Sequence, residues 1–240
     1  MIYTSTVSHC KYKQCIFHSV ECDKSNCRHY YIYQNIIDRN GGLHAIEILS
    51  RPISNIKISI EKYFDILSQD EGTKILKHQL LNFSKNFKKL DIGTKKIFLN
   101  VDKHLLNNQK NVDLLINSST DFNQNFWEIV FEITERQYGK IPGIRNAFCQ
   151  MILNDVLFAA DDYSSITNTH NFLIDYTYIK IDMHEIIERT NRDFNDFIDE
   201  LYLMKECGKK LIVEKIQTQN DYLLTIAMPF DYFQGFYFDD

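Results

Sequence analysis

The sequence predicts one α/β domain with the architecture of a TIM-type (β/α)8 barrel. From residue 29 onwards, short apolar runs rich in β-branched and aromatic residues alternate with longer amphipathic stretches, a pattern typical of strands that alternate with helices. The 240 residues suffice for one such barrel. Hydrophobic residues make up 44% of the chain, and glycine and proline are scarce, so the composition argues against a disordered protein.

Eight segments have the composition of strands. They are Tyr30–Ile37, Leu43–Leu49, Lys96–Val101, Trp127–Thr134, Leu157–Ala160, Tyr176–Ile181, Lys210–Val213 and Phe233–Phe238. Residues 39–42 (Arg-Asn-Gly-Gly) are typical of a tight turn, so the first two strands are expected to be antiparallel. The barrel is therefore expected to be mostly parallel, with an antiparallel first strand.

The clearest helix is expected between the sixth and seventh strands. It is predicted from about His184 to Cys207, and Gly208 is its stop signal. The sequence ends at Asp240, immediately after the last expected strand. The C-terminal helix that customarily closes such a barrel is therefore expected to be missing, and residues 1–28 or a second subunit are candidates to cover that edge.

Residues 1–28 are predicted to form a separate lead ahead of the barrel domain, which spans residues 29–240. The lead is polar, rich in cysteine and histidine and without clear periodicity. Cys10, Cys15, Cys22 and Cys27 lie close together in it, and soft ligands at this density are candidates for a structural zinc. Their spacing lacks the Cys-x2-Cys pair of zinc fingers, so a cysteine-rich packing segment is the alternative interpretation.

The formal net charge of -5 argues against a nucleic-acid polymer as partner, since such binding requires a basic surface. No apolar run approaches the roughly 18–20 residues that span a bilayer. The N-terminus also lacks the basic and apolar regions of a secretory signal. We therefore expect a cytoplasmic protein with no membrane partner, whose ligand can still be a small anion if bound cations reverse the local charge.

Polar residues interrupt or close most of the apolar runs. They are Glu47, Asn100, Glu132, Asp161, Asp162, Lys180 and Glu214. Each taken alone is more often a solvated rim group, a helix cap or half of an ion pair. In a TIM-type barrel, however, such residues at strand ends converge at one mouth. Five carboxylates together are costly to bury unless cations neutralise them, and oxygen ligands favour hard ions such as Mg²⁺ or Mn²⁺.

The order and context of these residues resemble the EAL domain family, the phosphodiesterases of cyclic di-GMP. Glu47-Ile-Leu-Ser-Arg51 resembles the motif Glu-Ala-Leu-x-Arg that names the family. The other similar segments are Tyr33-Gln34, Phe98-Leu-Asn100, Phe131-Glu-Ile-Thr-Glu135, Asp161-Asp162, Tyr178-Ile-Lys-Ile-Asp182, Val213-Glu-Lys-Ile-Gln-Thr218 and Phe233-Gln-Gly-Phe236. Each segment is a weak signal, but eight in the family's order between residue 29 and the C-terminus are a strong one.

The resemblance implies a two-metal site that takes Mg²⁺ or Mn²⁺. The implied ligands of the first cation are Glu47, Asn100, Glu132 and Asp161, and those of the second are Asp161, Asp162 and Glu214. Lys180 would orient a water molecule or stabilise developing charge, and Glu214 would also assist proton transfer.

The resemblance also implies residues that contact the substrate or support the site. The implied substrate-binding residues are Gln34, Leu49, Arg51 and Gln234. Arg51 is a candidate for a substrate phosphate, with a salt bridge at the rim as the alternative. Gln234 and Gln34 are candidates for a guanine edge, with backbone capping as the alternative. Asp182 and Gln217 are expected as supporting neighbours.

Two features depart from the family's pattern. After Asp162, the segment Tyr163-Ser-Ser-Ile-Thr-Asn-Thr-His170 lacks the glycines of the family's loop, so a different path is expected there. Lys215 stands where the family has the glycine of Glu-Gly-Val-Glu, and Gln217 replaces its second glutamate, which anchors that loop. The changes are mutually consistent, and they fit either a redesigned working loop or a site that has turned to regulation.

The function implied by the resemblance is metal-dependent hydrolysis of cyclic di-GMP to linear pGpG, in bacterial signalling that governs motility and biofilm formation. The alternative is a catalytically degenerate module that binds cyclic di-GMP or a protein partner as a regulator. Retention of every implied metal ligand favours the enzyme, because crowded acids are costly without a purpose. Family members often form homodimers, but the altered loop leaves the oligomeric state open.

Overall fold

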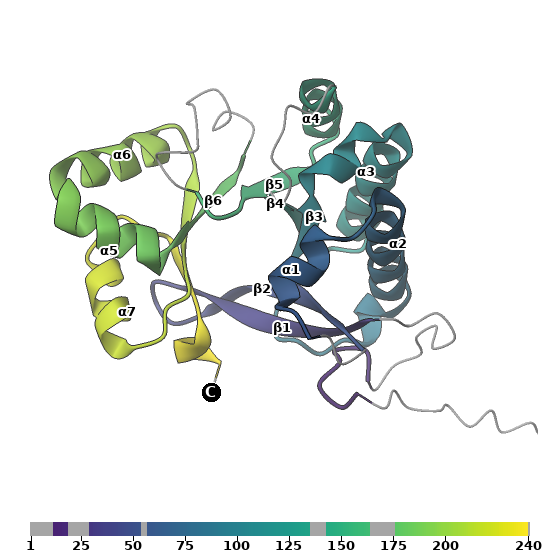
Figure 1. Ribbon diagram of the computed structural model, residues 1–240, viewed down its shortest axis with the longest axis horizontal. Coiled ribbons are helices and arrows are strands. Elements are labelled where there is room, and N and C mark those ends of the chain that lie inside the picture. The colour runs from purple at the N-terminus through teal and green to yellow at the C-terminus, as the bar shows by residue number, and fades with distance from the viewer. Residues whose placement is uncertain (1–11, 19–28, 54–56, 135–142, 164–175, 240) are drawn as a thin grey trace, which may run out of the picture.

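The computed structural model describes residues 12–18, 29–53, 57–134, 143–163 and 176–239. Eight strands form a closed barrel in sequence order (Figure 1). They are β1 (His29–Asp38), β2 (Leu43–Pro52), β3 (Lys96–Asp102), β4 (Glu128–Thr134), β5 (Leu157–Ala160), β6 (Tyr178–Asp182), β7 (Lys210–Glu214) and β8 (Tyr232–Gln234). β1 is antiparallel to both β2 and β8, and all other neighbouring strands are parallel. The predicted barrel with its antiparallel first strand is confirmed.

The helices lie outside the barrel in two groups. In Figure 1, α2, α3 and α4 are on the right and α5, α6 and α7 are on the left. Their bounds are α1 (Ile60–Asp65), α2 (Gln69–Asn86), α3 (Gln109–Gln124), α4 (Ile144–Ile152), α5 (Met183–Arg192), α6 (Phe194–Glu206) and α7 (Gln219–Ile226). Short 3-10 helices are η1 (Phe87–Lys89), η2 (Lys103–Asn107) and η3 (Phe236–Phe238). None of the described helices is long and apolar enough to cross a membrane.

Side chains at the helix starts explain where the long helices begin. Ser68 and Glu71 form a capping box at the start of α2, in which each side chain accepts a hydrogen bond from the other residue's backbone amide. Thr218 and Asp221 form the same motif at the start of α7. These reciprocal bonds satisfy amides that have no partner within the helix.

The single helix predicted from His184 to Cys207 is wrong, because two helices occupy this stretch. α5 ends at Arg192 and α6 begins at Phe194, and Asp193 between them leaves the helical conformation, with φ −154° and ψ 51°. The Asp193 carboxylate accepts a hydrogen bond of 2.7 Å from Arg189 Nε. Aspartate has a low helix propensity, which is consistent with a break between two helices at this residue.

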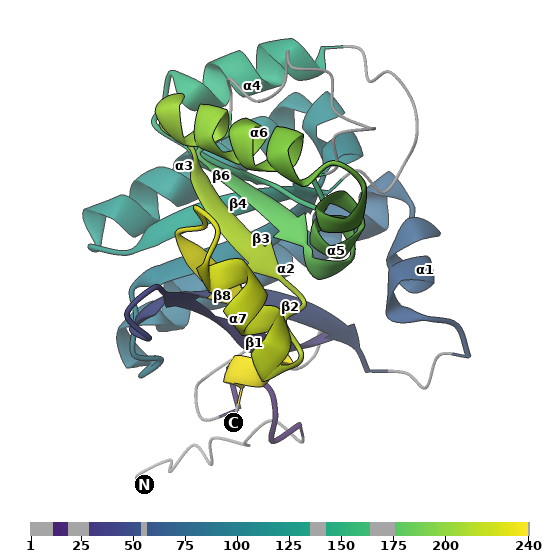
Figure 2. The same cartoon turned by 90° about the vertical axis from the view of Figure 1, so that its left-hand side faces the viewer.

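The last predicted strand, Phe233–Phe238, is also partly wrong. β8 ends at Gln234, and Gly235 then turns the chain into η3. Gly235 has φ 152°, and a Cβ on it would lie 2.1 Å from the Ile216 carbonyl oxygen, so only glycine fits this close approach. Within the described residues, no α-helix follows β8, and Figure 2 places this end of the chain beside β1 and α7.

The barrel interior is built by strict alternation along the strands, with inward residues two positions apart. Its middle layer is apolar and consists of Ile36, Ala45, Phe98, Val130, Ala159, Tyr178 and Ile212. The outward residues of the same strands, such as Leu99 and Ile179, belong to the larger core under the helices. The next inward position of each parallel strand, two residues further along the chain, is polar. These polar residues form the mouth of the barrel.

The described part of the N-terminal lead, residues 12–18, packs against β1. Cys15 and Phe17 are buried there, and Phe17 makes edge-to-face contacts with Tyr31 and Phe83. The Tyr31 amide donates a hydrogen bond of 3.5 Å to the Cys15 sulfur. The zinc prediction is not supported, since Cys15 packs as a small apolar residue while Cys10, Cys22 and Cys27 lie outside the described residues.

Candidate active site

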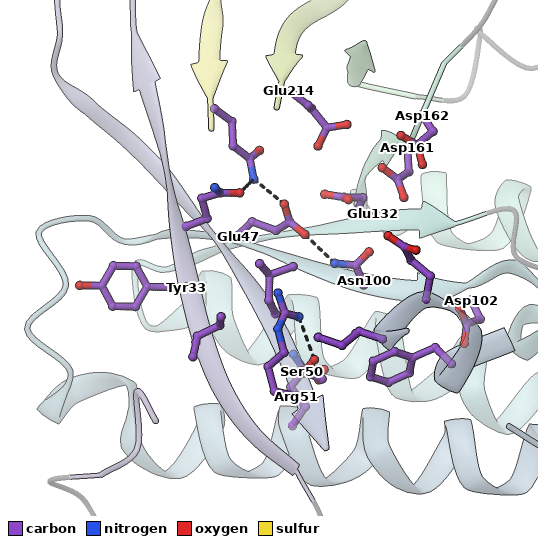
Figure 3. Close-up of a pocket in the computed structure, with 18 of the residues that line it drawn as sticks. Tyr33, Glu47, Ser50, Arg51, Asn100, Asp102, Glu132, Asp161, Asp162 and Glu214 are labelled. Carbon is purple, nitrogen blue, oxygen red and sulfur yellow. Dashed lines mark hydrogen bonds between the residues drawn. The ribbon is translucent and has the colours of Figure 1, made fainter. Parts of the chain in front are cut away.

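The seven polar residues singled out from the sequence converge at the carboxyl ends of the parallel strands. Glu47 comes from β2, Asn100 from β3, Glu132 from β4, Lys180 from β6 and Glu214 from β7, while Asp161 and Asp162 directly follow β5. Figure 3 shows the acids gathered around one side of a cavity, with Glu214, Glu132, Asp161 and Asp162 facing one another. β-alternation places the five strand residues on the inner face, and Asp161 continues the inward series of β5, whereas Asp162 follows it with a positive φ of 45°.

Lys180 lies at the centre of this mouth and has no exposed side-chain surface. Its ammonium contacts three buried carboxylates: Glu132 Oε2 and Glu214 Oε1 at 2.6 Å each, and Glu47 Oε2 at 3.0 Å. The negative charges of these residues and of Asp161 raise the pKa of Lys180 well above its usual value, although burial acts in the opposite direction. Lys180 is therefore held as a fixed ammonium.

Glu47 is held by three neighbours that donate hydrogen bonds. Besides Lys180, Gln234 Nε2 donates at 2.6 Å and Asn100 Nδ2 at 2.7 Å. Burial would raise the pKa of Glu47, but the charge of Lys180 and these hydrogen bonds outweigh it and lower that pKa. Glu47 is therefore the carboxylate of the mouth that is fixed as an anion, and its contact with Asn100 leaves the amide oxygen of Asn100 available to a ligand.

The other acids share too little positive charge. Burial and the charge of Glu47 raise the pKa of Glu132 well above its usual value. Burial, with the charges of Asp162 and Glu47, raises the pKa of Asp161 to about 6, although Lys180 lowers it. Burial likewise raises the pKa of Glu214 to about 8, against the lowering effect of Lys180. These three carboxyl groups therefore ionise less readily than usual, because Lys180 alone supplies too little positive charge to stabilise all of them as buried anions.

Two groups of carboxylate oxygens are close enough to hold a metal ion. Ligand atoms of Glu47, Glu132 and Glu214 lie within 4.8 Å of one another, and so do those of Asp161, Asp162 and Glu214. Oε2 of Glu214 is buried without a hydrogen-bond partner among the described residues, which is costly for a carboxylate. An all-oxygen donor set with an orphaned oxygen aimed into it fits a hard divalent cation.

The cavity that opens at this mouth has a volume of about 520 Å³, and the acids of the mouth are part of its lining. The four predicted substrate-binding residues line it, namely Gln34, Leu49, Arg51 and Gln234. Gln234 Nε2 donates a hydrogen bond of 3.0 Å to Gln34 Oε1, so the two glutamines form one unit that reaches Glu47. The side chain of Arg51 donates to the Ser50 carbonyl at 3.0 Å (Figure 3), and no rim salt bridge to it occurs among the described residues.

Sequence reasoning missed several lining residues, including Tyr33, Phe64 and Asp239. Asp239 accepts a hydrogen bond of 2.9 Å from Gln34 Nε2. Phe64 comes from α1, which lies beside the mouth (Figure 2). No strand-end pattern identifies these residues. Phe64 lies on the short helix α1, Tyr33 lies within β1, and Asp239 follows β8.

The two expected supporting residues have different partners. Asp182 accepts a hydrogen bond from the His184 amide and so caps α5, and it also pairs with Lys215. Gln217 lines the cavity, and its backbone amide donates to Asp221. The loop that Gln217 was expected to influence, from residue 164 onwards, lies outside the described residues, as does Glu135.

Two of three comparisons with known proteins found matches, and both agree with this geometry. The EAL domain family matches residues 19–240. No curated protein sequence matches the chain. Among solved structures, the EAL enzyme Bd1971 in its cGMP-bound form is similar, with TM-score 0.72 and 18% identity over 89% of this chain, which spans 62% of the length of Bd1971.

Two other similar structures are covered almost completely. An EAL domain protein from Listeria monocytogenes EGD-e has TM-score 0.69 and 17% identity over 88% of this chain and 87% of that one. A standalone versatile EAL protein from Vibrio cholerae O395, bound to c-di-GMP, has TM-score 0.68 and 18% identity over 91% and 92%. Identities this low establish the fold alone. The family match, however, covers nearly the whole sequence, and the chain therefore belongs to the EAL domain family.

Proposed function

We propose that the protein hydrolyses cyclic di-GMP to linear pGpG with the help of two divalent cations, Mg²⁺ or Mn²⁺. The observation that carries this proposal is the excess of buried carboxylates over positive charge at the mouth, together with the unpartnered Glu214 Oε2. A protein gains nothing by burying such a group of acids without a cation to neutralise them.

The proposed ligand sets are those that the resemblance to the EAL family implies, and the second of them coincides with one of the two carboxylate groups. Glu47, Asn100, Glu132 and Asp161 would hold one cation, and Asp161, Asp162 and Glu214 would hold the other. Bound there, the cations would supply an activated water and neutralise the phosphate. Because Lys180 contacts three of the acids at once, it would keep them in place, and its charge would orient the attacking water or stabilise the charge that develops during the reaction.

The reaction consumes one water molecule. The water oxygen bonds to phosphorus, the bond from phosphorus to one 3′ oxygen breaks, and the released 3′-hydroxyl takes up a proton. The unpartnered Glu214 oxygen is the candidate acceptor of the proton from water. Arg51 would bind the second phosphate through its donor fork, and the Gln34–Gln234 pair would hydrogen-bond a guanine edge, with Leu49 against the ligand.

The neighbours support this ligand. The Vibrio cholerae protein is described as bound to c-di-GMP, and the Bacillus subtilis protein YkuI is described in complex with substrate c-di-GMP and calcium. YkuI is 19% identical, with TM-score 0.65 over 87% of this chain and 54% of that one. Calcium, like Mg²⁺, takes oxygen ligands.

The direct test is incubation of the purified protein with cyclic di-GMP and Mg²⁺ or Mn²⁺, followed by separation of the nucleotides. We expect pGpG with either cation and none after chelation. Glu47→Ala is expected to abolish the product, and Glu188→Gln, which removes an exposed carboxylate on α5, is the matched control that keeps it. Turnover that persists in Glu47→Ala would contradict the assignment.

A second function, binding cyclic di-GMP without hydrolysis, is favoured by one observation. Lys215 places an ammonium against Asp162, a proposed ligand of the second cation. If that ammonium excludes the cation permanently, the chain is a receptor. Tight binding of cyclic di-GMP without pGpG at any Mg²⁺ or Mn²⁺ concentration would favour this alternative.

A further inference from the structure

Lys215 directly follows Glu214 and has an unusual backbone conformation for a lysine. Its φ is 59°, in the left-handed region that side chains with a Cβ enter only at a cost in energy. The same residue makes two ion pairs, one with Asp182 and one with Asp162 Oδ1 at 3.2 Å. The backbone turn therefore aims this ammonium back at the mouth of the barrel.

The position of this ammonium matters because of the carboxylates that it contacts. Asp162 belongs to the oxygen group with Asp161 and Glu214 that can hold a cation, and Asp182 lies at the end of the neighbouring strand β6. Burial lowers the pKa of Lys215, but the hydrogen bonds and negative charges of these two carboxylates outweigh burial and raise it. A covalently attached positive charge thus already interacts with one of the three acids that would bind the second metal ion.

We propose that Lys215 is a tethered cation that competes with the second divalent ion for Asp162. The proposal rests on the proposed function, since it takes the two-cation site as given, and it adds a chain-specific weakening of one half of that site. The ammonium of Lys180 also contacts proposed metal ligands, Glu47 and Glu132 of the first set and Glu214 of the second, but it is fully buried among them.

The exposure of the two lysines separates a fixed ammonium from a displaceable one. Lys180 has 0% exposed side-chain surface, whereas Lys215 is 58% exposed and Asp162 is 63% exposed. Exposed ion pairs are weak, so a divalent ion can displace the Lys215 side chain into water. The competition is therefore expected to lower the affinity of the second ion by roughly 2- to 5-fold rather than to abolish its binding.

The test is a calorimetric titration of the metal-free full chain with Mn²⁺ in the absence of nucleotide. We compare the wild type with Lys215→Met, which keeps the side-chain length and the strained backbone but removes the charge. Lys215→Gly also relieves the backbone, and Lys215→Arg keeps the charge. Lys205→Met is the matched control, since Lys205 pairs with Asp231 outside the mouth and its loss changes the net charge equally.

We expect two Mn²⁺ sites. The weaker site should bind Mn²⁺ roughly 2- to 5-fold more tightly in Lys215→Met and Lys215→Gly, and its affinity should stay unchanged in Lys215→Arg and Lys205→Met. An unchanged weaker site in Lys215→Met would overturn the proposal, and so would tightening in Lys215→Gly alone, because that would assign the effect to the backbone. Absence of Mn²⁺ binding in every variant would overturn both this inference and the proposed metal site. Failure of hydrolysis with two observed Mn²⁺ sites would instead affect the proposed function alone.

Discussion

Each end of the barrel interior holds a lysine among polar partners, but the two ends differ in their charge balance. At the mouth, Lys180 contacts three carboxylates and is fully buried. At the opposite end, Lys96 pairs with the single carboxylate of Glu128 at 2.6 Å and donates to the Tyr178 hydroxyl at 2.9 Å. The apolar middle layer separates the two ends.

The difference distinguishes a structural cluster from a functional one. Around Lys96 one positive charge meets one negative charge, and its side chain is 20% exposed, so the cluster needs no further ligand. Around Lys180 the acids outnumber the ammonium, and an oxygen of Glu214 has no partner. Stability at the mouth is therefore expected to depend on added cations, while stability at the opposite end is not.

Removing the lysine at each end tests this contrast with the largest expected effect. Lys180→Met leaves buried carboxylates without their ammonium, so we expect the metal-free protein to lose about 3–5 kcal/mol of unfolding free energy. Lys96→Met leaves one carboxylate that can reach water, and we expect a loss of about 1 kcal/mol. Urea unfolding in the presence of a chelator measures both.

Added Mn²⁺ provides the control for this pair. Mn²⁺ is expected to restore part of the stability of Lys180→Met, because the cations can neutralise the buried acids that have lost their ammonium. On Lys96→Met it is expected to have the same effect as on the wild type. Equal losses in the two variants would show that the charge imbalance between the two ends has no energetic consequence.

Removing a carboxylate at each end should give changes of opposite sign. Glu132→Gln relieves the cost of burying a carboxylate and its repulsion from Glu47, which together raise the pKa of Glu132, so the metal-free protein is expected to gain about 1–2 kcal/mol. Glu128→Gln removes the partner of Lys96 and is expected to cost about 0.5 kcal/mol, since that carboxylate is 41% exposed. Thermal unfolding without metal measures the sign of each change.

Mn²⁺ binding separates the two variants further. Glu132→Gln is expected to weaken it at least about tenfold, while Glu128→Gln leaves it unchanged. A loss of metal-free stability in Glu132→Gln would mean that the mouth is as well balanced as the opposite end.

The sequence made the mouth easier to predict than the opposite end. Polar residues such as Glu47 and Glu132 interrupt apolar strands, and period-two alternation then fixes which face they share. Lys96 and Glu128 stand at the first positions of their strands, where a charged residue is an ordinary strand start. Their contact follows only from the parallel register of β3 and β4, in which these two residues are partners.

Other features depend on backbone conformations that sequence patterns do not specify. Apolar residues at helical spacing continue on both sides of Asp193, so periodicity alone does not indicate that α5 ends there. Lys215 stood out in the sequence as a departure from glycine, but its ion pairs with Asp162 and Asp182 depend on a positive φ that lysine rarely adopts. The sequence therefore shows that lysine replaces the family's glycine, but it does not show that this lysine pairs with Asp162 and Asp182.

A histidine at the end opposite the mouth gives the smallest expected effect and a test by pH. Burial, followed by the charge of Lys96, lowers the pKa of His44 from 6.5 to about 4, and its Nε2 is buried without a partner among the described residues. The unfolded chain therefore takes up a proton near pH 6.5 that the folded protein refuses until about pH 4. The unfolding free energy is therefore not reduced by His44 above pH 6.5, and it falls as the pH decreases from 6.5 to about 4.

His44→Phe should remove this pH dependence while keeping the stacking on Tyr232, whose ring centroid lies 3.8 Å from that of His44. At pH 5 we expect the variant to be more stable than the wild type by on the order of 1 kcal/mol, a value reduced for solvent screening because the ring is only half buried. At pH 8 the two should differ little, as judged by urea unfolding. His184→Gln, at an exposed position on α5, is the control for loss of a histidine. The carboxylates of the mouth titrate alike in all three proteins, so their contribution cancels in the difference between variants. An equal pH dependence of the unfolding free energy in wild type and His44→Phe would show that folding does not lower the pKa of His44.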